Sequence, residues 1–160
     1  MKMTARIFNL ILLPLEVRAL SLCLQGRRWQ ALLVFYTQLS NLLTVIASLL
    51  LVLFGQSAWV SALRYTSVCM LLMTFFVTAC ILVPMGGEPV KLLFSGSGLY
   101  HHLLCPVLST ASYLLAEAHA PGGAILFPVG VTLVYGLVML ALNEKRIVDG
   151  PYPFFRMLFY

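Results

Sequence analysis

Residues 29–63 read WQALLVFYTQLSNLLTVIASLLLVLFGQSAWVSAL and form an uncharged run of 35 residues. A helix that crosses a bilayer needs about 20 apolar residues, so this run predicts a transmembrane helix. Its segment FYTQLSN, residues 35–41, would carry several polar side chains into hydrocarbon. Such side chains are costly, usually face the interior of a helix bundle and often belong to functional sites. The run therefore indicates the fold class and the first place to look for function.

The composition excludes a soluble globular domain, with 61% hydrophobic residues, 9% charged residues and a mean hydropathy of +0.98. Three more uncharged runs follow, at 65–87, 92–116 and 118–143. An earlier apolar segment contains Pro14 and is interrupted by Glu16 and Arg18. It is either a first span or an amphipathic helix lying in the membrane interface, and we favour the span.

These runs predict a single all-α domain, a polytopic bundle of about five transmembrane helices. The four cysteines lie in or beside the expected spans without C-x-x-C spacing, so we interpret them as apolar fillers rather than disulfides or metal ligands. The expected spans are 7–25, 30–54, 61–84, 97–118 and 123–143, followed by a tail at 144–160.

The positive charges predict the orientation, because cytoplasmic loops are enriched in Lys and Arg. One side of the expected bundle carries six such residues and the other side carries three. We therefore expect the richer side to be cytoplasmic and the N-terminus to be outside, in the plasma membrane if the protein is bacterial. The net charge of +5 reflects this loop bias and does not indicate nucleic-acid binding. The richer side has Arg27, Arg28, Lys91, Lys145, Arg146 and Arg156, and the other has Lys2, Arg6 and Arg64.

Polar residues recur at helical spacing in four of the expected spans. In the second span the recurrence is i, i+4, i+7 and i+11, which is one face of a helix. Ser and Thr usually serve there as interhelical glue, so packing is the first interpretation of each. Gln38 and Ser40 are expected to lie off this face. The polar faces are Thr37, Asn41, Thr44 and Ser48; Ser67, Thr74 and Thr78; Cys105, Ser109 and Ser112; and Thr132 with Tyr135.

His101 and His102 stand out because intramembrane histidines are rare and imidazole suits proton transfer near neutral pH. The alternative is headgroup anchoring or a satisfied core contact, while His119 is expected in a solvated loop. Thr37 and the histidine pair enter from the same side, at depths of roughly 10 Å and 6 Å for a rise of 1.5 Å per residue. If their helices are neighbours, a hydroxyl and an imidazole could form an activated nucleophile.

Three motifs, FYTQLSN at 35–41, YHHLLCP at 100–106 and GPYPF at 150–154, carry a resemblance to a known family. In order and placement they resemble the androgen-induced and androgen-dependent integral-membrane hydrolases and their small bacterial multipass relatives. The resemblance implies intramembrane hydrolysis of fatty acid esters of hydroxy fatty acids, with a Thr nucleophile at Thr37. The His partner matches His101 by the animal pattern and His102 by the bacterial pattern, and we favour His102. The family usually has about six spans and a longer chain, so the resemblance predicts that this chain is a shortened member or a fragment.

The leading hypothesis is therefore a carboxylic ester hydrolase acting on lipid esters that enter from the membrane. Thr37 would attack the ester carbonyl, and His102 or His101 would move the proton. Asn41 and Gln38 are the candidates for orienting the histidine or stabilising the oxyanion, with no metal or organic cofactor. A transporter or channel component and a structural or assembly subunit remain as non-catalytic alternatives.

Overall fold

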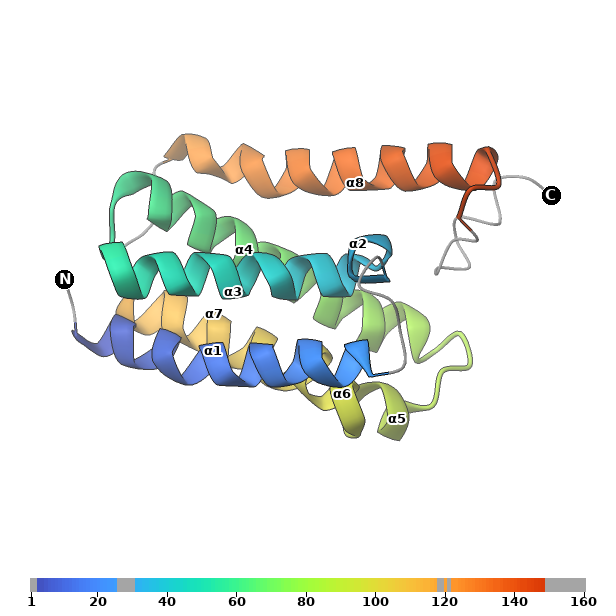
Figure 1. The fold of residues 1–160 in the computed structure, drawn as a ribbon, viewed down its shortest axis with the longest axis horizontal. Coiled ribbons are helices and arrows are strands. Elements are labelled where there is room, and N and C mark those ends of the chain that lie inside the picture. Colours follow the sequence, from blue (N-terminus) through green and yellow to red (C-terminus); the bar gives the residue numbers. More distant parts are fainter. Residues whose placement is uncertain (1–2, 26–30, 118–119, 121, 149–160) are drawn as a thin grey trace.

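The computed structural model describes residues 3–25, 31–117, 120 and 122–148, with the backbone alone at 31 and 32. In this part of the chain every regular element is helical, which confirms the expected all-α bundle (Figure 1). The expected tail beyond residue 148 and His119 lie outside the described residues. Four helices are long and apolar enough to cross a membrane: Met3–Leu24, Tyr36–Phe54, Ala58–Leu82 and Gly122–Glu144.

The first helix, α1 (Met3–Leu24), is continuous through Pro14. It packs against α3 and α7, with Glu16 buried in the bundle and Arg18 exposed (Figure 1). Because α1 packs against two helices of the bundle and is long enough to cross the membrane, it is better suited to spanning the membrane than to lying flat in the interface.

The expected helix at 30–54 is wrong in one respect, because it is broken at Phe35. Helix α2 (Ala31–Val34) ends there and α3 (Tyr36–Phe54) begins, with Phe35 in an extended conformation at φ −94° and ψ 125°. The break leaves the Val34 carbonyl without a donor from its own helix. The hydroxyl of Tyr135 on α8 supplies one at 2.7 Å. A tertiary contact therefore stabilises the interruption.

Helix α4 (Ala58–Val77) continues into the π-helical segment η1 (Thr78–Leu82), and the connection after it contains the short helix α5 (Pro89–Leu93). The expected helix at 97–118 runs from Gly96 to Ala116, and it is not one of the four long apolar helices. It consists of α6 (Gly96–Gly98), the π-helical η2 (Leu99–Leu104) and α7 (Cys105–Ala116). Pro106 has no N–H to donate to the carbonyl four residues earlier, which accounts for the wider turn before it.

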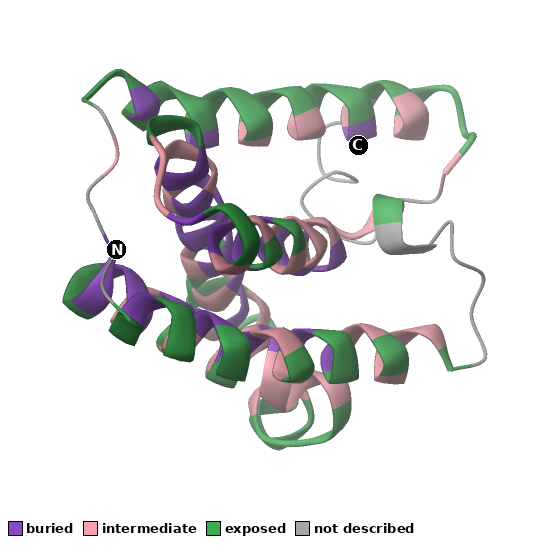
Figure 2. Cartoon of the chain, turned by 60° about the vertical axis from the view of Figure 1, so that its left-hand side comes forward, coloured by how far each residue is buried: buried purple, intermediate pink, exposed green. Residues whose placement is uncertain are grey.

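The final long helix combines the 3₁₀ turn η3 (Gly122–Ile125) with α8 (Leu126–Glu144). It runs along one side of the bundle (Figure 1), and most of its surface is exposed (Figure 2). The buried residues are concentrated on α1, α3, α4 and α7 (Figure 2). Gln38 and Ser40 are among them, and the Ser40 hydroxyl packs against Thr74 of α4 at 3.1 Å.

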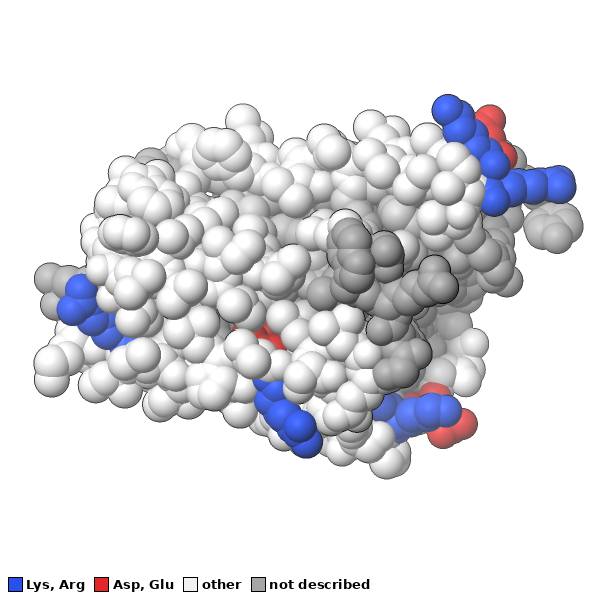
Figure 3. Space-filling view, viewed as in Figure 1, with Lys and Arg blue, Asp and Glu red and all other residues white. Residues whose placement is uncertain are grey.

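The Lys and Arg side chains on the visible face are few and lie mainly toward the ends of the bundle (Figure 3). Lys91 on α5 and the pair Lys145 and Arg146 after α8 belong to the same end, where α1 also terminates (Figure 1). Arg64 is different. The sequence places it among the loop charges of the opposite side, and this prediction is wrong, because Arg64 is completely buried within α4.

Candidate functional site

A buried ion pair occupies the bundle at the end away from α5. The guanidinium of Arg64 on α4 lies 2.8 Å from the carboxylate of Glu117, which directly follows α7, and both side chains are at most 1% exposed. Burying two charges is favourable only when hydrogen bonds satisfy the remaining donors and acceptors. The neighbours do this: Arg64 donates to Ser48, Ser67 and Ser109, and Glu117 accepts from Ser112 and Asn9.

This network explains part of three of the four predicted polar faces in physical terms. Ser48, Ser67, Ser109 and Ser112 belong to three of the predicted faces, and all of them bind the ion pair. Their role is structural, because they join α3, α4 and α7 through a charge that would otherwise be unpaired in hydrocarbon. The members of the predicted polar faces outside this network are Thr37, Asn41 and Thr44 on α3, Thr74 on α4, Thr78 on η1, Cys105 on α7, and Thr132 and Tyr135 on α8.

Glu16 carries a second buried carboxyl. In the sequence it is visible only as a charge that interrupts the first apolar segment. It is 0% exposed and faces the Cys105 side chain across the α1–α7 interface. One turn farther along α1, the Ala19 backbone faces His101. The two contacts define an antiparallel register, since the sequence numbers rise on one helix as they fall on the other.

Thr37, Gln38, His101 and His102 line one cavity, which we call the histidine cavity. It has a volume of about 440 Å³, and Leu22, Phe35, Leu82 and Leu92 are among its other walls. The polar lining comes from the end of α1, the start of α3, α6 and the π-helical segment η2. The structure therefore brings together four of the five predicted site residues.

The fifth, Asn41, lies outside this lining and is completely buried. Its Nδ2 donates to the backbone carbonyl of Thr37 at 2.6 Å, and Ser40 Oγ donates to the same carbonyl at 2.9 Å. Asn41 therefore fixes the turn that carries Thr37 rather than facing the cavity.

Thr37 lies in the first turn of α3 because the helix begins only at Tyr36. It was expected about seven residues inside a continuous helix, where every backbone N–H has a carbonyl partner. After the break, the N–H groups of Gln38 and Leu39 both donate to the Phe35 carbonyl. The N–H of Thr37 has no carbonyl one turn earlier in its own helix.

His102 is oriented by the backbone. Its Nδ1 lies 2.8 Å from the Leu92 carbonyl oxygen. A carbonyl only accepts, so Nδ1 carries the proton and Nε2 of the neutral ring keeps its lone pair. No sequence pattern indicates Leu92, because any residue type could present this carbonyl. His101 also borders the cavity but is 1% exposed, and neither of its nitrogens has a hydrogen bond of good geometry.

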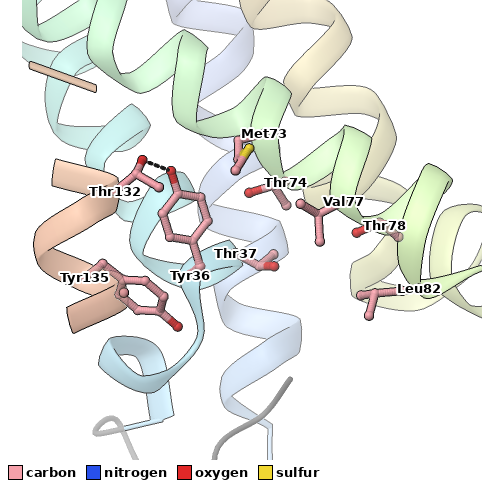
Figure 4. A pocket seen from close by; sticks show the side chains of 10 residues that line it. Tyr36, Thr37, Met73, Thr74, Val77, Thr78, Leu82, Thr132 and Tyr135 are labelled. Atoms are coloured by element: carbon pink, nitrogen blue, oxygen red, sulfur yellow. Dashed lines mark hydrogen bonds between the residues drawn. The ribbon is translucent and has the colours of Figure 1, made fainter. Parts of the chain in front are cut away.

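A second cavity, the α8 cavity, adjoins the first one. It has a volume of about 130 Å³ and lies between α3, the α4–η1 helix and α8 (Figure 4). Thr37 and Leu82 line both cavities. The hydroxyls of Tyr36 and Thr132, 2.7 Å apart, bond to each other at its edge. Thr37 thus lies between a cavity with imidazoles and a cavity formed largely by side-chain carbon.

Among the described residues, no cluster of three or more His, Cys, Asp or Glu side chains could hold a metal ion. Comparison of the chain with known protein families, curated proteins and solved structures found no match. Functional assignment therefore depends on the geometry of the two cavities and on the motifs of the sequence.

Proposed function

We propose that this protein is an intramembrane hydrolase of lipid esters, with Thr37 as nucleophile and His102 as the general base. The observation that carries the proposal is the shared cavity: Thr37 and His102 line it together, and the Leu92 carbonyl leaves Nε2 of His102 as the basic nitrogen. Nucleophilic catalysis needs a hydroxyl and an oriented imidazole that can come within hydrogen-bond reach, and the shared cavity holds one of each.

In the first step, Thr37 Oγ attacks the ester carbonyl while His102 Nε2 accepts its proton. The tetrahedral intermediate then collapses, the C–O bond to the leaving alcohol breaks, and His102 returns the proton to that alcohol. Water hydrolyses the acyl-threonine by the same two proton transfers and frees the carboxylic acid. The cycle needs no metal ion and no organic cofactor.

The developing oxyanion requires donors near the attacked carbon. The Thr37 N–H, in the first turn of α3, and the side-chain amide of Gln38 are the closest candidates in sequence and cavity lining. Asn41 has an indirect role in this proposal. Its side chain donates to the Thr37 carbonyl and so stabilises the turn that carries Thr37. His101 supports the cavity wall between α1 and η2.

The substrate class comes from the membrane setting and from the sequence resemblance. A lipid ester can enter sideways between helices without crossing water, and the motifs favour fatty acid esters of hydroxy fatty acids. We also propose that the end with Lys91, Lys145 and Arg146 faces the cytoplasm, following the positive-inside rule. The histidine cavity then opens near the cytoplasmic surface.

The test uses the purified protein in detergent with a fluorophosphonate probe and a hydroxy-fatty-acid ester. Wild type should be labelled and should release fatty acid, whereas Thr37→Ala should do neither. Thr37→Ser should keep labelling because it keeps the hydroxyl. The matched control is Thr44→Ala, two turns along the same helix, whose hydroxyl donates to the Ser40 backbone carbonyl outside both cavities.

Labelling that persists in Thr37→Ala would exclude Thr37 as the nucleophile. A wild-type protein that is folded yet unlabelled, and that leaves the ester intact, would favour the non-catalytic alternatives. Among these, a transporter component would show substrate flux in proteoliposomes, and an assembly subunit would show none.

A further inference from the structure

The α8 cavity begins at the proposed nucleophile and leads away from the histidines. Thr37 lies on its wall, with Met73 and Val77 of α4 on one side and Tyr135 of α8 on the other (Figure 4). An ester carbonyl placed at Thr37 would therefore have its two substituents near two different cavities. The histidine cavity is polar enough for the leaving alcohol, which receives its proton from His102.

The hydroxyl groups that border the α8 cavity are largely committed elsewhere. Thr74 Oγ1 donates to the Met70 carbonyl and lies 3.1 Å from Ser40 Oγ, and Thr132 bonds to Tyr36. What these side chains offer to the cavity is mainly carbon. An apolar cavity of about 150 Å³ stays dry and takes a benzene-sized ligand, so this one suits roughly six carbons of an acyl chain.

Gly136 forms part of the far wall on α8. A Cβ added at this position would meet no atom within 4 Å, so the position has room for a larger side chain. Tyr135 lines both this cavity and a wide outer groove between α3 and α8. A chain longer than the cavity thus has a way out past Tyr135 into the lipid beside α8.

We propose that the α8 cavity binds the acyl chain next to the scissile carbonyl, and that Gly136 determines which chain lengths are accepted. The inference rests on the proposed hydrolase function. Gly136 is the one glycine among the residues that line the α8 cavity. A larger residue there would narrow the cavity where it meets α8. Long acyl chains would be blocked, whereas short ones would end before reaching α8.

Gly130 supplies a matched control on the same helix. A Cβ at Gly130 also meets nothing within 4 Å, but Gly130 lines the outer groove and not the α8 cavity. Replacing either glycine by leucine improves helix propensity, so both variants are expected to fold. The thermal unfolding temperatures of both variants in detergent, compared with that of wild type, show whether they fold.

The experiment measures kcat/KM for p-nitrophenyl acetate, butyrate, octanoate and palmitate. Gly136→Leu should reduce the values for octanoate and palmitate by about tenfold or more, since a single misfitting methylene in an apolar pocket has an effect of this order. Acetate and butyrate should stay within about twofold, and Gly130→Leu should leave all four esters within about twofold. An equal loss for every ester, or no loss for the long ones, would overturn the assignment of the cavity.

A second readout separates this inference from the hydrolase itself. A palmitate with a mid-chain diazirine is photo-crosslinked to Thr37→Ala protein, and the adducts are located by mass spectrometry. Adducts at Met73 or Val77 that disappear with an added Gly136→Leu change would support the cavity even if no ester is hydrolysed. Adducts restricted to the outer surface of α8, with equal yield in both proteins, would contradict it.

Discussion

Arg64 on α4 and Glu117 at the end of α7 form an ion pair whose nitrogen and oxygen lie 2.8 Å apart inside the bundle. Besides pairing with each other, these two side chains bond to Asn9 on α1, Ser48 on α3 and Ser109 on α7. One charge pair thus connects the four helices that form the core. It lies at the end of the bundle opposite the histidine cavity, so stability and the proposed chemistry can be tested separately.

We predict that Glu117→Leu is strongly destabilising, because it leaves the Arg64 charge buried without its partner. The expected loss is about 3–5 kcal/mol in the free energy of unfolding. The double variant Arg64→Met/Glu117→Leu should recover much of this loss, since it removes both charges. Denaturant unfolding in detergent, followed by circular dichroism, measures both effects.

The exposed Glu88, just before α5, provides the control. Glu88→Leu should change the unfolding free energy by less than about 0.5 kcal/mol. If Glu117→Leu were as mild as this control, the ion pair would contribute little to the fold.

A second prediction concerns the break before Thr37. Tyr135→Phe removes the donor to the Val34 carbonyl and should cost about 1–3 kcal/mol, the penalty for an unsatisfied buried group. Fluorophosphonate labelling of the folded protein should also fall, because the turn at Phe35 and Tyr36 loses its tertiary support. Tyr65→Phe, on the partly exposed side of α4, should change neither quantity. Unchanged labelling in Tyr135→Phe would show that the break persists without α8.

The sequence predicted the helices and their polar faces well, because hydrophobic length and helical periodicity are local properties. The positions of Ser48, Ser67 and Ser109 inside the bundle follow from that periodicity alone. The break at Phe35 does not follow from this periodicity. A large aromatic residue within an apolar run carries no signal for an extended backbone, and the contact that stabilises it comes from Tyr135, 101 residues away from Val34.

Arg64 illustrates a second limit of sequence analysis. A charge between two apolar runs marks a boundary unless a partner neutralises it inside the bundle, and Glu117 lies 53 residues further along the chain. The placement of the candidate site was partly predictable: Thr37 and the histidines do share a cavity. The group that orients His102 was not, because it is the backbone carbonyl of Leu92.

A third prediction tests the π-helical segment that carries the histidines. Pro106→Ala supplies the missing N–H and allows ordinary α-helical bonding to extend into η2. The side chain of His102 should then rotate away from Leu92, and labelling should fall although the thermal stability stays equal or rises. Pro14→Ala is the matched control, because Pro14 is exposed within α1. A Pro106→Ala protein that is labelled like wild type would show that the π-helical turn is not required.

The last prediction distinguishes the two histidines. His102→Asn keeps a side-chain N–H close to the position of Nδ1, so it can still donate to the Leu92 carbonyl while lacking Nε2. We expect ester hydrolysis to fall by about 10²–10⁴-fold, the usual contribution of a general base, with little change in unfolding temperature. His101→Asn should instead lower stability at the α1–η2 contact and leave the rate per folded molecule within about tenfold, because His101 is not oriented by a comparable bond. Rates are measured on protein quantified by its folded fraction. If His101→Asn abolishes hydrolysis and His102→Asn spares it, the base is His101 and the Leu92 contact is purely structural.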